Sequence, residues 1–123
     1  MKPDVVSFNI LLNSCNHCGL VHRGHFWFET MKTCYGIVPH VGHYTCMIDL
    51  LGRAGRFDEV IFMLKGMPVD PDILLWHTVL AACQKWGNIE LGRLAFERAL
   101  RLHENDAAIY VLISNVYASA IVE

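Results

Sequence analysis

A pattern of two consecutive amphipathic helices repeats along the chain, and this repetition restricts the fold more than any other feature. The clearest copy spans residues 43–67, where apolar residues recur at i, i+3, i+4 and i+7 on both sides of Gly55. The second helix is expected to end before Pro68 and Pro71, because proline lacks a backbone donor and disfavours helical geometry in the residue before it. This copy therefore predicts a helical hairpin.

The same pattern returns 36 residues upstream, 32 residues downstream and a further 34 residues downstream. The turn between the two helices falls on Gly19, Gly55 and Gly87. The corner before each hairpin keeps the same register, at Pro3-Asp4, Pro39-His40, Pro71-Asp72 and Asn105-Asp106. Self-similarity at a period of roughly 20 to 50 residues indicates stacked supersecondary units. We therefore expect an all-α solenoid of helical hairpins.

The repeats resemble a known family. Residues 5–12 (VVSFNILL), residues 36–39 (GIVP) and residues 43–56 (HYTCMIDLLGRAGR) are similar to pentatricopeptide repeats of the plant organellar kind. The 36-residue unit followed by a 32-residue unit resembles the last long and short repeats of the P-L-S subclass. Trp76, residues 87–92 and residues 110–118 resemble the E motifs that follow those repeats in RNA-editing factors. The resemblance covers nearly the whole chain and implies a right-handed α-α superhelix.

The register divides the chain into five segments. They are the tail of a preceding repeat (1–4), a long-type hairpin (5–40), a short-type hairpin (41–72), a tetratricopeptide-like E-motif hairpin (73–106) and the first helix of a truncated further motif (107–123). Both ends fall inside the period, so we expect a segment of a longer array. The outer face of the first hairpin and the last helix, with Val111, Ile113, Val116 and Tyr117, are expected to be exposed. Uncovered apolar faces of this kind predict self-association.

The resemblance implies that each repeat reads one base of single-stranded RNA. The reading residues are the fifth residue of the first helix and the last residue of the repeat. Here these are Asn9 with His40, and Thr45 with Asp72. The second pair resembles a combination that prefers guanine. In the first pair, Asn9 suggests a pyrimidine, while His40 departs from the usual Asp or Asn.

The resemblance also implies that a base is sandwiched between the second residues of adjacent repeats, here Val6 and Gly42. Glycine offers little apolar surface for this contact. In the alternative interpretation, Asn9, Thr45 and Asp72 only decorate an exposed face, and Asp72 or Asp106 caps the next helix.

The charge balance bears on how tightly this segment alone binds RNA. The net charge is −2, whereas non-specific affinity for RNA comes mainly from Lys and Arg side chains that neutralise phosphates. Two readers, at about 1 to 3 kcal/mol per stacked base, barely offset the cost of association. We therefore expect weak RNA binding. We expect no membrane helix, because no apolar run approaches roughly 18 residues, and the N-terminus is no targeting peptide.

A second function class concerns residues 73–123. Tetratricopeptide-like hairpins commonly present grooves to proteins, and the base-reading slots here hold His77 and Val111, which do not suit edge recognition. The resemblance thus implies a factor for organellar RNA processing, above all C-to-U editing in the mitochondrion or chloroplast. In it the first half contacts RNA and residues 73–123 recruit editing-complex proteins.

A third class is a zinc enzyme built on Cys15, Cys18, His22 and His25, since C-x-x-C followed by histidines can complete a zinc site. The repeat register disfavours it, because both cysteines occupy slots expected to point into the hairpin as small apolar side chains. Most histidines are expected on the surface, with His25 as the exception in a core slot. The chain has no recognisable catalytic motif and no H-x-E deaminase signature. We therefore expect no enzyme activity, no cofactor and no metal.

Overall fold

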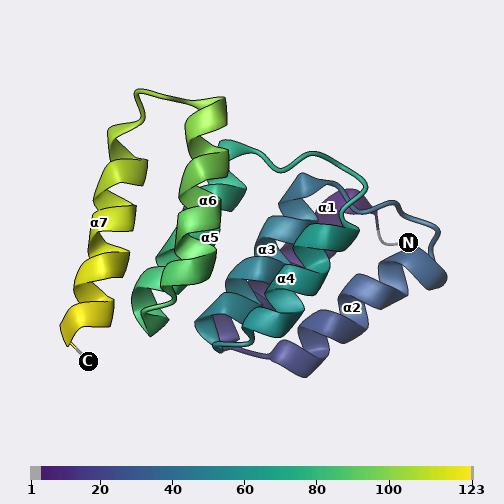
Figure 1. Cartoon of the computed structure of the whole chain (residues 1–123). Coiled ribbons are helices and arrows are strands. Elements are labelled where there is room, and N and C mark those ends of the chain that lie inside the picture. The colour runs from purple at the N-terminus through teal and green to yellow at the C-terminus, as the bar shows by residue number, and fades with distance from the viewer. Residues whose placement is uncertain (1–3, 123) are drawn as a thin grey trace. The chain divides into compact units, whose positions relative to one another are not determined.

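The computed structural model describes the backbone of residues 4–122 and the side chains of residues 4–121. Seven α-helices form most of this part of the chain (Figure 1). They are α1 (Val5–Cys18), α2 (Val21–Thr33), α3 (Val41–Arg53), α4 (Phe57–Gly66), α5 (Ile73–Trp86), α6 (Ile89–Leu102) and α7 (Ala107–Val122). Residues 4–122 contain no β-strand. The prediction of an all-α fold is confirmed. Residues 1–3 of the predicted repeat tail (1–4) and the final residue of the last segment lie outside the described residues.

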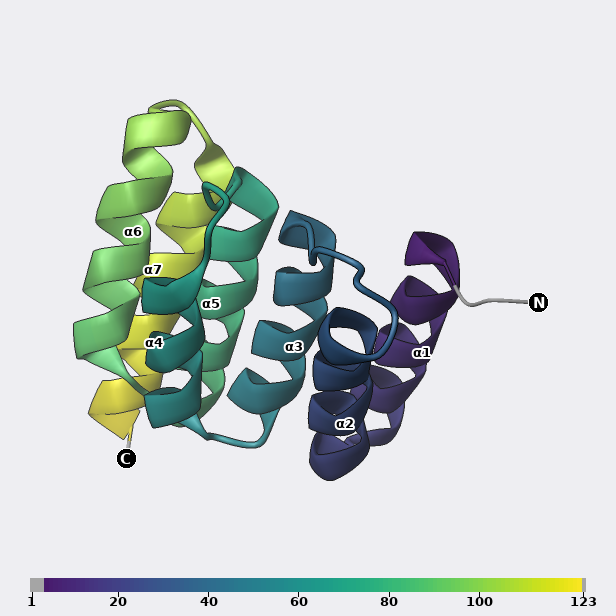
Figure 2. The same ribbon diagram turned by 90° about the vertical axis from the view of Figure 1, so that its right-hand side faces the viewer.

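The helices form two compact units, one ending at Asp70 and one beginning at Pro71. In the first unit, α1 packs on α2 and α3, and α3 packs also on α2 and α4 (Figure 2). In the second unit, α5 packs on α6 and α7, and α6 packs on α7. Each unit is therefore built from helical hairpins that contact their neighbours in sequence, as in a solenoid.

Three glycines form the hairpin turns that the sequence predicts. Gly19, Gly55 and Gly87 have φ values of 67°, 74° and 67°, in the left-handed region where a side chain is disfavoured. The residue after each glycine donates its N–H to a carbonyl five residues earlier, at 2.9 to 3.0 Å. This bond satisfies carbonyls at the end of the first helix and reverses the chain.

The core of the first unit comes from the predicted apolar slots. The side chains of Phe8, Leu12, Met47, Ile48 and Leu51 are almost fully buried. The rings of Phe28 and Tyr44 meet edge to face with centroids 5.2 Å apart, which joins α2 to α3.

Gly24 lets α2 and α3 approach closely. A Cβ atom built on Gly24 would lie 2.5 Å from Cδ2 of Leu50, closer than carbon atoms tolerate. The equivalent position in α6 is Gly92, where a Cβ atom would lie 3.1 Å from Cγ1 of Val116 in α7. Glycine thus occupies a packing position in both units.

The last helix contributes more to the core than its lack of a partner suggested. Ile113 and Val116, which we expected to be exposed, are buried together with Ile109. They are covered because α7 packs on both α5 and α6. The expectation of exposure is correct for Val111, whose side chain is 58% exposed.

Other expectations were wrong for residues close to helix ends. Cys18, expected to point into the hairpin, is exposed, as is Trp86 in the equivalent slot. Both lie in the last turn before a glycine, beyond the region that the returning helix covers. Cys15 is buried as expected, and desolvation raises the pKa of its thiol. Among residues 4–122, no helix is long and apolar enough to cross a membrane.

Candidate nucleic-acid interface

The expected base-reading residues occupy equivalent places in the helices that open each hairpin. Asn9 and Thr45 are the fifth residues of α1 and α3, and His40 immediately precedes α3. In the second unit, Asp72 precedes α5 and His77 is its fifth residue. These positions share one register along the described chain, and their role in reading bases stays a prediction.

Polar side chains follow the face of α3 that is opposite its core. Thr45, Asp49 and Arg53 recur at i, i+4 and i+8, which places them on one side of the helix. The buried Met47 and Ile48 lie on the other side. Since a helix that opens a hairpin needs only one apolar face, this second face is free to carry polar groups.

The equivalent face of α1 bonds to that of α3. Asn16 donates through Nδ2 to Oδ2 of Asp49 at 2.7 Å, and Arg53 pairs with both oxygens of the same carboxylate at 3.1 and 3.2 Å. Cys46 Sγ donates to Oδ1 of Asn13 at 3.0 Å. We call these side chains, with Asn9 and Thr45, the polar strip. Its one carboxylate is neutralised by Arg53, so the strip has little net charge to repel an RNA backbone.

The predicted residues on α1 and α3 differ in their bonds. Thr45 Oγ1 donates to the carbonyl of Val41 at 2.9 Å, which fixes its hydroxyl along the helix. Asn9 is half-buried, and its Oδ1 has no hydrogen-bond partner among the described residues. A buried amide oxygen without a partner costs stability, and because this atom is screened from solvent, a ligand does not reach it in this arrangement. Val6, expected to contact a base face, is 64% exposed.

His40 and His43 form a connected pair at the start of α3. The Gly42 N–H donates to Nδ1 of His40 at 2.9 Å, and the His40 N–H donates to Nδ1 of His43 at 3.1 Å. His43 Nε2 donates to the carbonyl of Val5 at 3.3 Å, which links the start of α3 to the start of α1. The two rings lie 3.9 Å apart. Through these bonds, His43 holds the backbone and the ring of His40 in place.

His43 is a further exception to our expectation that most histidines lie on the surface. His43 is fully buried, and desolvation lowers the pKa of its imidazole. His25 is half-buried, with Nε2 3.3 Å from Oε1 of Glu59. The H-x-x-H spacing of His40 and His43 is the sequence signal for this pair, because it matches a helix N-cap and its third residue.

Asp72 caps a helix in the second unit. Its Oδ1 accepts the N–H of Leu75 at 2.9 Å, as the alternative interpretation anticipated. Asp4 does the same for Ser7 at the start of α1, and this backbone hydrogen bond lowers the pKa of the Asp4 carboxyl. In each case one carboxylate oxygen serves the helix and the second lies outside that cap bond.

The corresponding residues of the third hairpin bond to each other. His77 Nε2 lies 2.8 Å from Oδ2 of Asp106, and Oδ1 of Asp106 accepts the N–H of Ala108. The hydrogen bond from His77 is the main reason that the pKa of Asp106 lies below its ordinary value. A pair closed on itself in this way is poorly placed to read a base edge.

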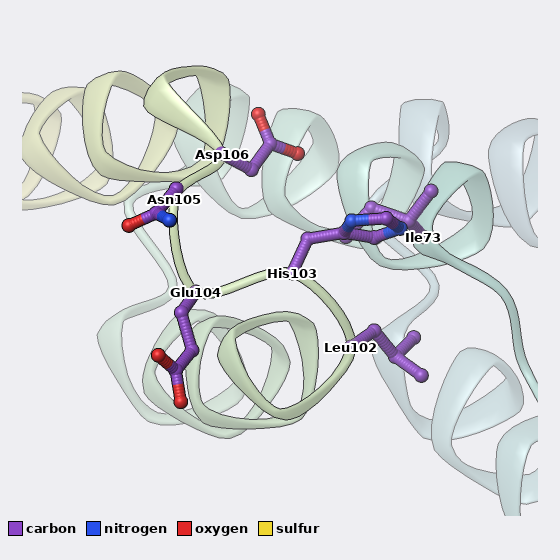
Figure 3. Close-up of a pocket in the computed structure, with 6 residues that line it drawn as sticks. All are labelled: Ile73, Leu102, His103, Glu104, Asn105 and Asp106. Carbon is purple, nitrogen blue, oxygen red and sulfur yellow. The ribbon is translucent and has the colours of Figure 1, made fainter.

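The loop that carries Asp106 borders a shallow depression of about 560 Å³. In Figure 3, the His103 ring extends toward Ile73, while the side chains of Glu104 and Asn105 point away from it. The residues that line this depression include apolar and polar side chains, and they form no recognisable catalytic cluster.

The expected cysteine and histidine positions do not gather into a metal site. Cys15 is buried and Cys18 is exposed, and all five cysteines are free thiols. Within residues 4–122, no three His, Cys, Asp or Glu side chains are grouped as metal ligands.

The stacked hairpins define the protein as a helical-repeat solenoid protein, a class in which each repeat contacts mainly its neighbours. The sequence profile of the PPR repeat matches residues 6–35 and 42–70. The chain belongs to the pentatricopeptide repeat family.

Relatives from Arabidopsis thaliana support this family membership. One putative pentatricopeptide repeat-containing protein is 44% identical over 119 residues, and a second such protein is 42% identical over 120 residues. These alignments cover 97% and 98% of this chain but 16% and 15% of the relatives. A third relative, named as mitochondrial, is 42% identical over 98% of this chain and 20% of its own length. The chain therefore spans about a fifth or less of the relatives it matches.

Proposed function

We propose that this chain is part of a sequence-specific factor that binds single-stranded RNA and positions it for processing in an organelle, without catalysing a step itself. The process that we favour is C-to-U editing in the mitochondrion or chloroplast. Family membership supports RNA binding, and a relative named as mitochondrial supports an organelle. The resemblance of residues 73–123 to E motifs supports editing in particular.

The observation that carries the proposal is the polar strip. It extends along neighbouring helices of two consecutive repeats, and it includes the side chains of Asn9 and Thr45, the fifth residues of α1 and α3. Polar groups at one-turn spacing suit the exposed Watson–Crick edges of unpaired bases. The neutralised Asp49 explains how such a strip tolerates RNA in a chain whose net charge is −2.

Titration of the full chain with RNA octamers that differ at a single base tests this proposal, using NMR because the expected affinity is weak. Thr45, which the family register pairs with Asp72, is expected to favour guanine. The Thr45→Asn variant should change that preference. Thr33→Asn is the matched control, because Thr33 also donates to a carbonyl four residues earlier but lies at the exposed end of α2. Equal binding of all four bases by the unmodified chain would refute base reading.

A second function, recruitment of editing-complex proteins by residues 73–123, rests on a different observation. In this unit the slots of the reading pair are closed by the bond between His77 and Asp106, while Val111 and Tyr110 of α7 are 58% and 49% exposed. Apolar surface without competing RNA contacts suits a protein partner. Purified editing-complex proteins should bind the chain, and Val111→Glu should weaken that binding more than Glu104→Gln in the exposed α6–α7 loop. Equal affinities for the two variants would argue against this role.

Self-association through the exposed surface of α7 is our third proposal. Helix α7 carries no charged residue, and Ile121 near its end is 80% exposed. Such a face buries more apolar area in a dimer than in a monomer. Sedimentation velocity at micromolar concentrations should show a reversible dimer that Val111→Glu weakens, and a monomer at every concentration would refute the proposal.

A further inference from the structure

A buried histidine joins the starts of α1 and α3. The side chain of His43 is fully buried, although the residue lies in the first turn of α3. Its Nδ1 accepts the backbone N–H of His40 at 3.1 Å, and its Nε2 lies 3.3 Å from the carbonyl oxygen of Val5. A backbone N–H only donates and a carbonyl only accepts, so the neutral ring carries its hydrogen on Nε2. Both ring nitrogens are therefore engaged, one at the start of α3 and one at the start of α1.

The protonated form of His43 does not fit this arrangement. Protonation would place a hydrogen on Nδ1, which faces the N–H of His40. Two donors would then oppose each other, and a positive charge would lie in a fully buried site. The ring can accommodate the proton only by leaving its site, and this movement breaks the bond to Val5. The bonds alone therefore make the site selective for the neutral imidazole.

His40 is the titratable group that faces the His43 ring. The two ring centroids lie 3.9 Å apart, so an imidazolium at either position would repel one at the other. On the side of α1, the Asp4 carboxylate next to Val5 accepts the N–H and the hydroxyl of Ser7. Burial is the main cause that lowers the pKa of the His43 imidazole, and His40 acts in the same direction. Among the described residues, no carboxylate bonds to the His43 ring to stabilise a positive charge.

The charged side chains of the other two helices that pack on α3 are engaged elsewhere. Those of α2 and α4 lie around a cavity of about 290 Å³ that α2, α3 and α4 line. They pair with one another there, His25 with Glu59 and Lys32 with Glu29. In the described part of the chain, none of them bonds to His43. The response of His43 to pH therefore depends on its own site and on His40.

The contact between α1 and α3 has polar links at two levels. The bond from His43 to Val5 joins the starts of the two helices. Further along, Asn16 Nδ2 donates to Oδ2 of Asp49 at 2.7 Å. Loss of the first link alone lets the starts of the helices separate while the second link still holds them together. Protonation of His43 thus acts on one end of the contact between two repeats.

We propose that His43 is an acid-sensitive latch between the first two repeats, which holds the starts of α1 and α3 together as a neutral imidazole and releases them when it takes up a proton. This device belongs to the fold and does not depend on RNA binding. A released histidine has an ordinary pKa of about 6.5. Because the buried ring excludes the proton, the latch is closed above that pH and opens as pH falls below it.

Hydrogen exchange of the His40 amide tests the latch in the full chain, because this N–H is the one that His43 accepts. Its protection, corrected for the intrinsic pH dependence of exchange, should fall about tenfold from pH 7.5 to pH 5.5. This is the effect of one proton that is taken up on opening. Amides in the middle of α3 should keep their protection over the same range.

His43→Gln separates the titration from the packing. Glutamine supplies both a donor and an acceptor and stays neutral at every pH, so the tenfold change should disappear. His22→Gln is the matched control, because it makes the same change at an exposed position of α2 and should leave the tenfold change intact. Circular dichroism checks that both variants fold. A residue with a structural role alone would change the protection without changing its pH profile.

The nitrogen-15 shifts of the His43 ring provide a second readout, which needs no variant. At pH 7.5 they should show an unprotonated Nδ1 and a protonated Nε2. Protection of the His40 amide that does not vary with pH would overturn the latch, as would an equal tenfold loss in His43→Gln. A chain in which His43 is protonated while the His40 amide stays protected would also overturn it.

Discussion

Replacing Gly24 with alanine tests how closely α2 and α3 must pack to form the first unit. The added Cβ atom would lie 2.5 Å from Leu50 Cδ2 and 3.5 Å from Met47 Sδ. Leu50 and Met47 are almost fully buried, so neither can move without displacing other core atoms. Overpacking of this kind costs about 1 to 3 kcal/mol, while alanine regains about 1 kcal/mol of helix propensity. We expect a net loss of about 1 kcal/mol in the stability of the first unit.

Gly66→Ala is the matched control. Gly66 also lies in a helix, and nothing lies within 4 Å of the Cβ atom that it would gain. This variant should be neutral or slightly stabilising. The stability effect of Gly92→Ala in the second unit should lie between those of the other two variants, because the added Cβ atom would lie 3.1 Å from Val116 Cγ1.

Native-state hydrogen exchange is the suitable assay, since it reports on each unit of the full chain separately. Relative to Gly66→Ala, protection of α2 and α3 in Gly24→Ala should fall by about tenfold for each 1.4 kcal/mol. Protection of α5 and α6 should not change. Equal protection of α2 and α3 in the two variants would refute the close packing of these helices.

Three further predictions concern the helix starts. Gly42→Ala should displace the His40 ring and break its cap bond to the Gly42 N–H, at a cost of about 1 kcal/mol of stability that urea unfolding measures. Burial lowers the pKa of His43, so its stabilising contribution is complete above an unfolded-state pKa of about 6.5 and declines as pH falls below it. Urea midpoints measured from about pH 7.5 to about pH 5 should decrease, and a flat profile would contradict this. The hydrogen bond from His77 is the main cause that lowers the pKa of Asp106. The stability that the Asp106 carboxylate contributes is therefore present above its unfolded-state pKa and is lost as pH falls through its folded-state pKa. Asp106→Asn should weaken this acid sensitivity of the second unit.

The repeated pattern was enough to predict the hairpins, because each depends on local signals. Apolar residues at helical spacing place Phe8 and Ile48 in the core, and a glycine in the left-handed region ends the first helix at Gly19 and Gly55. These signals act within one repeat. They do not specify how one hairpin lies against the next.

Features that the pattern does not predict depend on contacts between neighbouring helices. Tyr44 and Tyr110 occupy equivalent slots, but Tyr44 is 7% exposed and Tyr110 is 49% exposed. Each tyrosine ring contacts a phenylalanine of the preceding helix. Tyr44 also borders residues of the following helix, α4, which cover more of its side chain. Likewise, the bond from Asn16 to Asp49 joins residues 33 positions apart and requires the alignment of α1 with α3. A pattern read within one repeat contains no information on such contacts.

The residue before each opening helix caps that helix, and its identity decides which kind of polar atom is left outside the cap bond. At Asp4 and Asp72, one oxygen accepts a backbone N–H of the first turn, and the atom outside that bond is an acceptor. At His40, Nδ1 accepts the backbone N–H, and the remaining nitrogen is a donor. A backbone N–H in the first turn of each opening helix needs an acceptor. The cap residue therefore uses an accepting atom of its side chain for that bond, whichever residue it is. Replacing aspartate with histidine therefore changes the group left outside the cap bond from a hydrogen-bond acceptor to a donor.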